Sequence, residues 1–172
     1  MRASAAAMCV LAAMMCGQAQ DAHTAEWRTA TDAEMKSVIP ARAPVVTERI
    51  ETEMRSASGI TNGHGKYIAG VVLITAGYSA EGKYSHFFLT QVPLKLGGSL
   101  ELPAGEYVIG YEHTDKGLLV HFYEAATGNP VGSVLATLIP GITRVEQIRV
   151  WPPRDRAVIQ IGRFGFSYQI GG

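Results

Sequence analysis

The chain has 172 residues, which suffice for one domain with a substantial core and are too few for two large ones. Charged residues make up 17% and hydrophobic residues 47%, a profile that excludes a disordered chain or a coiled coil. Fifteen basic and fifteen acidic side chains cancel, so the charge pattern gives no support for a nucleic-acid partner or an anionic membrane surface.

Residues 1–19 have the features of a secretory signal peptide. Arg2 supplies a positive charge, residues 3–16 are apolar or small, and Gly17 and Ala19 offer small side chains at a cleavage site. The apolar run is short for a spanning helix, which needs about twenty such residues. We therefore expect export to the periplasm or the cell exterior, with no membrane span in the mature chain. An uncleaved anchor is the alternative.

Both cysteines, Cys9 and Cys16, lie in this first segment. Lipoprotein anchoring through Cys16 is disfavoured, because Met15 is too large for the position before a lipidated cysteine. Cleavage after Ala19 leaves a mature chain without cysteine, which excludes disulfides, thiolate nucleophiles and cysteine-based zinc sites there. The mature chain is then expected to be held together by its hydrophobic core alone.

Residues 20–64 are polar and irregular, and we interpret them as an N-terminal arm. Thr31 and Glu34 match a capping box, because a threonine at the cap position is followed three residues later by a glutamate. The match predicts a short helix over 32–38 that ends before Pro40.

The second half of this arm predicts a strand followed by a loop. Residues 45–54 alternate in part and are rich in β-branched side chains, which favours a strand, although the apolar spacing also fits a helix. Residues 56–65 are small, polar and glycine-rich, which is typical of a loop.

From residue 65 to residue 172, β-branched and aromatic runs alternate with turn signals at short, regular intervals. The run over 67–75 is apolar almost throughout, which predicts a central strand covered on both faces. The pattern predicts an all-β fold, an antiparallel β-sandwich or flattened barrel of about eight strands. The other expected strands cover residues 84–92, 107–113, 118–124, 131–139, 145–151, 157–162 and 164–170, with a Gly97-Gly98 turn between apolar segments over 94–102.

Residues 114–118 predict a hairpin with a three-residue loop, in which Gly117 takes the position that needs a positive φ. This register places Tyr111 opposite His121 and gathers aromatic residues on one face. A two-residue loop would shift the register by one residue and separate His113 from His121. The residues gathered on this face are Tyr107, Tyr111, His113, His121 and Tyr123.

This predicted tyrosine and histidine face is a candidate ligand site. Tyrosine offers an apolar ring with a polar handle, which suits a flat or sugar-like ligand. Ordinary cross-strand packing, or a second sheet that covers the face, is the other interpretation. We add His64 to the candidate site, because it lies in the glycine-rich Gly59–Gly65 loop and loops often carry binding residues.

Motifs for catalysis or metal binding are missing from the sequence. The five histidines form no closely spaced pair, and His113 with His121 would supply only two ligands. The chain has no G-x-S-x-G motif, no calcium-loop pattern and no phosphate loop. We therefore expect no catalytic residue, no metal and no cofactor.

These observations favour an exported, non-enzymatic binding or accessory module with an unidentified ligand or protein partner in the cell envelope. One alternative is a small hydrolase-type enzyme with its site near the Gly59–Gly65 loop and the His113/His121 hairpin. That alternative predicts that His64, His86, His113 and His121 meet in one cleft. Another alternative is a structural subunit of an envelope assembly, in which residues 20–64 donate a strand to a neighbour.

Overall fold

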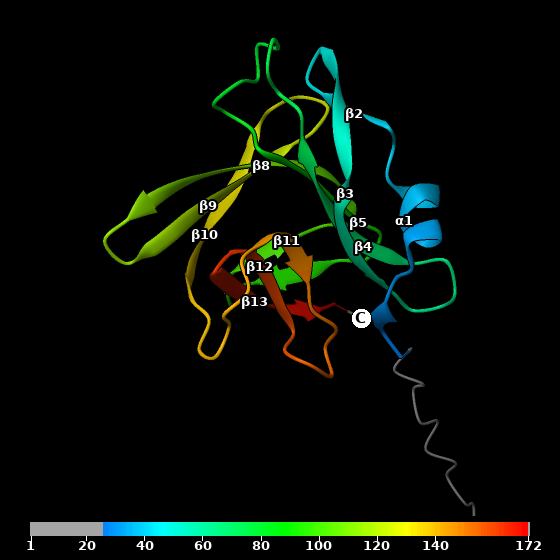
Figure 1. Ribbon diagram of the computed structural model, residues 1–172, viewed down its shortest axis with the longest axis vertical. Helices are drawn as coiled ribbons and strands as arrows, with labels where there is room; N and C mark the ends of the chain where they lie inside the picture. The colour runs from blue at the N-terminus through cyan, green and yellow to red at the C-terminus, as the bar shows by residue number, and fades with distance from the viewer. Residues whose placement is uncertain (1–25, 172) are drawn as a thin grey trace, which may run out of the picture.

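The structure is a computed structural model that describes residues 26–171, and this part of the chain is nearly all β (Figure 1). The predicted signal peptide over 1–19 lies outside the described residues. The prediction of an all-β antiparallel fold is confirmed. The elements are β1 (Arg28–Thr29), α1 (Asp32–Val38), β2 (Arg42–Val45), β3 (Glu48–Thr61), β4 (Tyr67–Leu73), β5 (His86–Thr90), β6 (Leu94–Leu96), β7 (Leu100–Leu102), β8 (Gly105–Thr114), β9 (Gly117–Glu124), β10 (Pro130–Leu138), β11 (Glu146–Val150), β12 (Val158–Gly162) and β13 (Phe164–Ile170).

The strands form one antiparallel sheet that curls into a nearly closed barrel. Along the sheet the order is β1-β3-β4-β5-β8-β9-β10-β13-β12-β11, with β2 paired to β3 and the β6–β7 hairpin paired to β13. The two ends of the sheet lie close together. The Val150 amide of β11 donates a hydrogen bond to Ser58 Oγ of β3 at 3.1 Å. Ile148 of β11 also packs directly over Gly70 of β4. Side-chain contacts therefore close the barrel where β11 meets β3 and β4.

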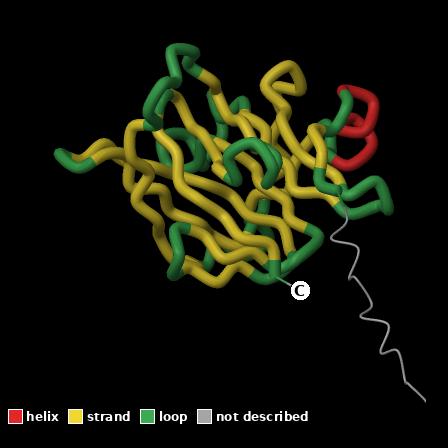
Figure 2. The backbone as a smooth tube through the Cα atoms, turned by 90° about the horizontal axis from the view of Figure 1, so that it is seen from below, coloured by secondary structure: helices red, strands yellow, loops and turns green. Residues whose placement is uncertain are grey.

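Alternate residues of the central strands face two hydrophobic clusters. Ile68 and Phe88 belong to a cluster inside the barrel. Ala69 and Phe87 belong to an outer cluster, which also contains Met35 of α1. The helix lies on the outside of the sheet, at one side of the barrel (Figure 2). The prediction that residues 67–75 form a central strand covered on both faces is confirmed over β4.

The helix α1 begins at the predicted capping box. Thr31 Oγ1 accepts a hydrogen bond from the Glu34 amide at 3.3 Å, and Glu34 Oε2 accepts one from the Thr31 amide at 2.8 Å. Glu34 also forms an ion pair with Arg28 at 2.7 Å. The hydrogen bond from Arg28, and to a lesser extent the one from the Thr31 amide, lowers the pKa of Glu34 to about 2. The helix ends at Val38, two residues before Pro40, as predicted.

The strand predicted over 45–54 is confirmed only from Glu48 onward, because Val45 ends β2 and residues 46 and 47 form the turn between the two strands. The loop predicted over 56–65 is wrong at its start, because β3 continues to Thr61. A bulge between Glu53 and Ser58 shifts the register and accommodates the small residues there. Gly59 is needed for packing, since a Cβ there would lie 2.8 Å from Met35 Sδ of the helix. The strand β3 pairs with β4, so the chain on both sides of the boundary expected at residue 64 belongs to the same sheet.

Candidate functional site

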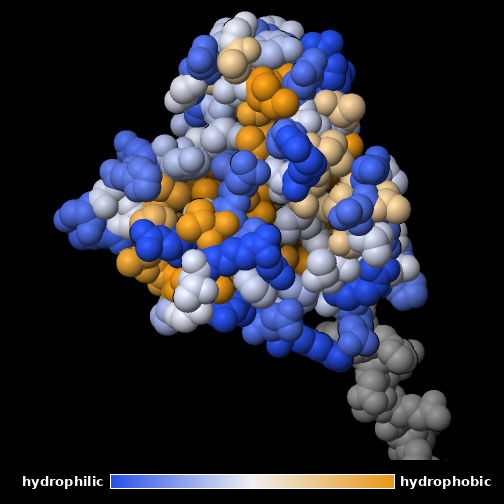
Figure 3. Space-filling model, viewed as in Figure 1, coloured by the Kyte–Doolittle hydropathy of each residue, from blue (hydrophilic) through white to orange (hydrophobic). Residues whose placement is uncertain are grey.

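A cleft of about 670 Å³ opens at one end of the barrel, beside the projecting β8–β9 hairpin. It is lined by the last residues of β4, β8 and β12 and by the first residues of β5, β9, β11 and β13. Because the strands are antiparallel, these segments all lie at the same end of the barrel. The volume falls in the range of roughly 300–1,000 Å³ that is usual for small-molecule sites. Figure 3 shows apolar surface between the hairpin and the strands below it.

His86 lies at the floor of this cleft and is only 3% exposed. Its Nε2 lies 3.0 Å from the Gln147 carbonyl oxygen, which can only accept, so this nitrogen carries the proton. Nδ1 then accepts a hydrogen bond from Ser85 Oγ at 2.8 Å. Burial lowers the pKa of His86 to about 4, and the hydrogen bond to Gln147 opposes this effect only in part. The neutral ring therefore connects β5 to β11, where the barrel closes.

Four aromatic rings, which we call the aromatic row, run along the cleft: His86, Tyr111, His113 and Phe164. The ring centres of His86 and Tyr111 are 6.1 Å apart, and those of Tyr111 and His113 are 6.3 Å apart. His113 meets Phe164 edge to face at 5.9 Å. The row joins β5, β8 and β13, and Tyr111 keeps 42% of its surface exposed. The cleft therefore offers aromatic surface to a ligand without a large rearrangement.

The charged side chains around the cleft already have partners. Glu146 Oε1 lies 3.1 Å from Arg144 Nε and 3.3 Å from Arg149 Nη1. The Lys83 ammonium lies 5.6 Å from the centre of the Tyr123 ring, a cation–π contact on the outer face of the sheet. The interior of the cleft is therefore aromatic and neutral in character.

The predicted register of the β8–β9 hairpin is wrong by one residue. Thr114 pairs with Gly117, and Tyr111 pairs with Val120, so only two residues form the loop. Gly117 lies at the start of β9, and a Cβ there would overlap the Ala136 carbonyl oxygen of β10. The glycine is thus required for the close approach of β10, whereas the sequence suggested a role inside the loop.

This shift divides the predicted ligand-binding face between the two sides of the sheet. Tyr111 and His113 lie on the inner face and line the cleft. Tyr107 shares their face but is 5% exposed, and its hydroxyl donates to the Pro103 carbonyl at 2.7 Å. His121 and Tyr123 lie on the outer face. Only two of the six predicted residues therefore meet in the cleft.

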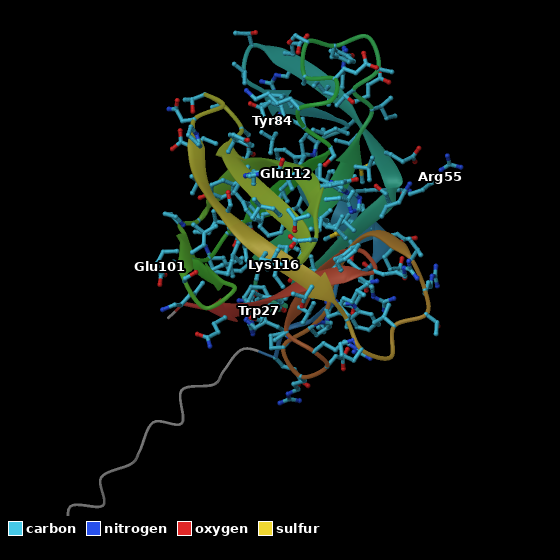
Figure 4. All side chains as sticks on the ribbon, turned by 90° about the vertical axis from the view of Figure 1, so that its left-hand side faces the viewer. Trp27, Arg55, Tyr84, Glu101, Glu112 and Lys116 are labelled. Atoms are coloured by element: carbon cyan, nitrogen blue, oxygen red, sulfur yellow. The ribbon has the colours of Figure 1, made fainter. Side chains whose placement is uncertain are left out.

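The remaining predicted residues have other neighbours. His121 lies with Nδ1 2.7 Å from Ser133 Oγ and Nε2 3.5 Å from Glu112 Oε1, which is labelled in Figure 4. Tyr123 packs edge to face on Tyr84 at 5.3 Å. His64 is in the β3–β4 turn, where its amide donates to Asn62 Oδ1 at 2.8 Å. The hydrolase alternative predicts that His64, His86, His113 and His121 meet in one cleft. In the structure only His86 and His113 line the same cleft.

Sequence reasoning left Gln147 and Phe164 out of the candidate site and named His86 only within the hydrolase alternative. His86 gave a signal, because it is the one titratable side chain in an otherwise apolar run over 86–89. Phe164 begins the strand expected over 164–170, and nothing in the sequence connects it to the hairpin. Gln147 contributes a backbone carbonyl, which carries no sequence signal.

Residues 26–171 offer neither a metal centre nor a membrane-spanning helix. In this range, no three histidine, aspartate, glutamate or cysteine side chains lie close enough together to hold a metal ion. No helix found there has the length and apolar character needed to cross a bilayer. The cleft is therefore the feature of the described chain that most resembles a ligand site.

We compared the chain with models of protein families, with curated proteins and with solved structures, and none of them matches. Inference about function therefore rests on the cleft itself.

Proposed function

We propose that this protein is an exported, non-enzymatic module that binds a small organic ligand in the mouth of its barrel. The observation that supports the proposal is the aromatic row along a cleft of about 670 Å³. Export is proposed from the signal peptide predicted over 1–19. The mature protein would then meet its ligand in the periplasm or outside the cell.

The packing below the cleft limits how deeply a ligand enters. Phe122 packs edge to face on Phe88 at 5.9 Å and on Phe166 at 6.0 Å, and these rings belong to the inner cluster. His86 lies above them, buried and bonded to β11. A ligand would therefore bind at the mouth of the barrel, against the aromatic row, and would leave one side exposed to solvent.

Binding of N-phenyl-1-naphthylamine, an uncharged aromatic probe that fluoresces in apolar sites, tests this proposal. We expect saturable fluorescence with the wild-type protein and affinity about tenfold weaker in Tyr111→Ala, which corresponds to about 1.4 kcal/mol of lost aromatic contact. His121→Ala is the matched control, because it removes an aromatic ring from the outer face of the same hairpin. Equal loss in both variants, or no saturable binding, would contradict the proposal.

One contact favours a second candidate, a hydrolase that acts on esters in the same cleft. Ser85 Oγ lies 2.8 Å from Nδ1 of the neutral His86, whose other nitrogen is oriented by the Gln147 carbonyl. A serine next to an oriented histidine is the arrangement that activates a nucleophile. The low pKa of His86 makes it a weak base, and Ser85 Oγ also lies 3.1 Å from the Ile109 carbonyl, so this candidate ranks second.

Hydrolysis of p-nitrophenyl acetate separates the two candidates. If Ser85 is a nucleophile, the wild-type protein releases p-nitrophenolate faster than Ser85→Ala does. Equal rates in the two proteins would exclude the hydrolase and leave the binding module.

A further inference from the structure

The charges around the cleft disfavour a charged ligand. Apart from the histidines, Lys83 and Glu146 are the charged residues that line the cleft in the described part of the chain. Glu146 is paired with two arginines, and the Lys83 ammonium lies over Tyr123 on the outer face. A charged ligand would lose water in the cleft without gaining a counter-ion, and such a loss is costly.

The polar groups that are left for a ligand are neutral or belong to histidine. Within residues 26–171, the Tyr111 hydroxyl and the His113 ring belong to residues that line the cleft, and neither makes a hydrogen bond to another protein group. A hydroxyl group and an imidazole ring can each donate and accept hydrogen bonds, so their natural partners are hydroxyl and amide groups of a ligand. The rim of the cleft therefore matches a ligand with several uncharged polar groups.

A sugar ring combines the two properties that the cleft requires. Its C–H groups form an apolar face, which fits against an aromatic side chain, and its hydroxyl groups project from the edge of the ring. We infer that the cleft binds an uncharged carbohydrate, with a sugar ring against the aromatic row and hydroxyl groups on the neutral polar groups of the rim. This inference rests on the proposed function and adds the class of ligand to it.

Isothermal titration calorimetry on the purified protein tests the inference with defined trisaccharides. The uncharged probes are chitotriose, cellotriose and maltotriose, and the charged probes are the deacetylated, cationic form of chitotriose and anionic trigalacturonate. We expect at least one uncharged trisaccharide to bind, and both charged ones to bind about tenfold more weakly or not at all. Tyr111→Ala should weaken that binding about tenfold, and the control His121→Ala should change it by less than about twofold.

The outcomes separate this inference from the function on which it rests. If no uncharged trisaccharide binds and N-phenyl-1-naphthylamine still binds, the carbohydrate assignment is wrong and the small-molecule module stands. If neither kind of probe binds, the proposed function fails as well. Tighter binding of a charged trisaccharide than of every uncharged one, or binding that Tyr111→Ala leaves unchanged, would also overturn the inference.

Discussion

Mild acid should destabilise this protein through one buried histidine. The pKa of His86 is about 4 in the folded protein, against 6.5 for an unperturbed histidine. Below pH 6.5 the unfolded chain takes up a proton at this position, and the folded protein does not until the pH approaches 4. The stability that depends on the neutral ring is therefore complete above pH 6.5 and is lost between pH 6.5 and pH 4.

The size of the effect follows from the two pKa values. Each pKa unit corresponds to about 1.4 kcal/mol, so the full loss is about 3 kcal/mol, of which about 2 kcal/mol has occurred by pH 5. The Glu34 carboxylate affects the free energy of unfolding in a lower pH range, because its pKa is about 2 in the folded protein and 4.5 ordinarily. Stability that depends on Glu34 is present above pH 4.5 and is lost as the pH falls toward 2. Glu34 therefore contributes little between pH 6.5 and 4.5, the interval in which most of the change from His86 falls.

Urea unfolding at several pH values between 7.5 and 4.5 measures this effect. The free energy of unfolding should fall across the interval in the wild-type protein and stay nearly level in His86→Gln, whose side chain does not titrate. The comparison uses the slope with pH, so a lower overall stability of the variant does not affect it. His121→Gln is the comparison variant, because it removes a histidine from the outer face, away from the cleft. An equal slope in wild type and His86→Gln would refute the reasoning.

Other predictions follow from the packing. Gly117→Ala should cost about 1–3 kcal/mol, because the new Cβ would overlap a carbonyl of β10 in a left-handed backbone, whereas Gly63→Ala, in an open turn, should cost about 1 kcal/mol. Equal losses in thermal unfolding would disprove the close approach of β10. Phe88→Ala should cost about 3–5 kcal/mol, since the ring is fully buried. Thr31→Ala should cost about 1 kcal/mol in chemical unfolding, and no loss would mean that the capping box is dispensable.

The features that the sequence predicted correctly depend on neighbours close in the chain. The capping box of α1 spans four residues, and the apolar run of β4 reports burial on both faces of a strand. Such patterns need no knowledge of the tertiary structure. The element boundaries of the later strands follow for the same reason, because turn residues interrupt each run.

The features that were missed depend on distant neighbours. Ser56 and Ser58 resemble loop residues, but their hydroxyls accept from the amides of Val72 and Val150, which lie far along the chain. Gly117 of the β8–β9 hairpin is also ambiguous in the sequence, because a positive φ in a loop and a close approach of another strand both require glycine. The cleft depends on His86, whose carbonyl partner is 61 residues away. Periodicity does not encode such pairs.

The closure of the barrel has a consequence for its motion. Among the described strands, β11 pairs by backbone hydrogen bonds with β12 alone, and its contacts with β3 and β5 run through Ser58 and His86. Amide protons on the free side of β11 should therefore exchange with deuterium sooner than those of β4 and β8, which have a paired strand on each side. Since β11 also forms one wall of the cleft, a ligand held between that wall and the hairpin should slow this exchange and make the barrel more rigid at its weakest junction.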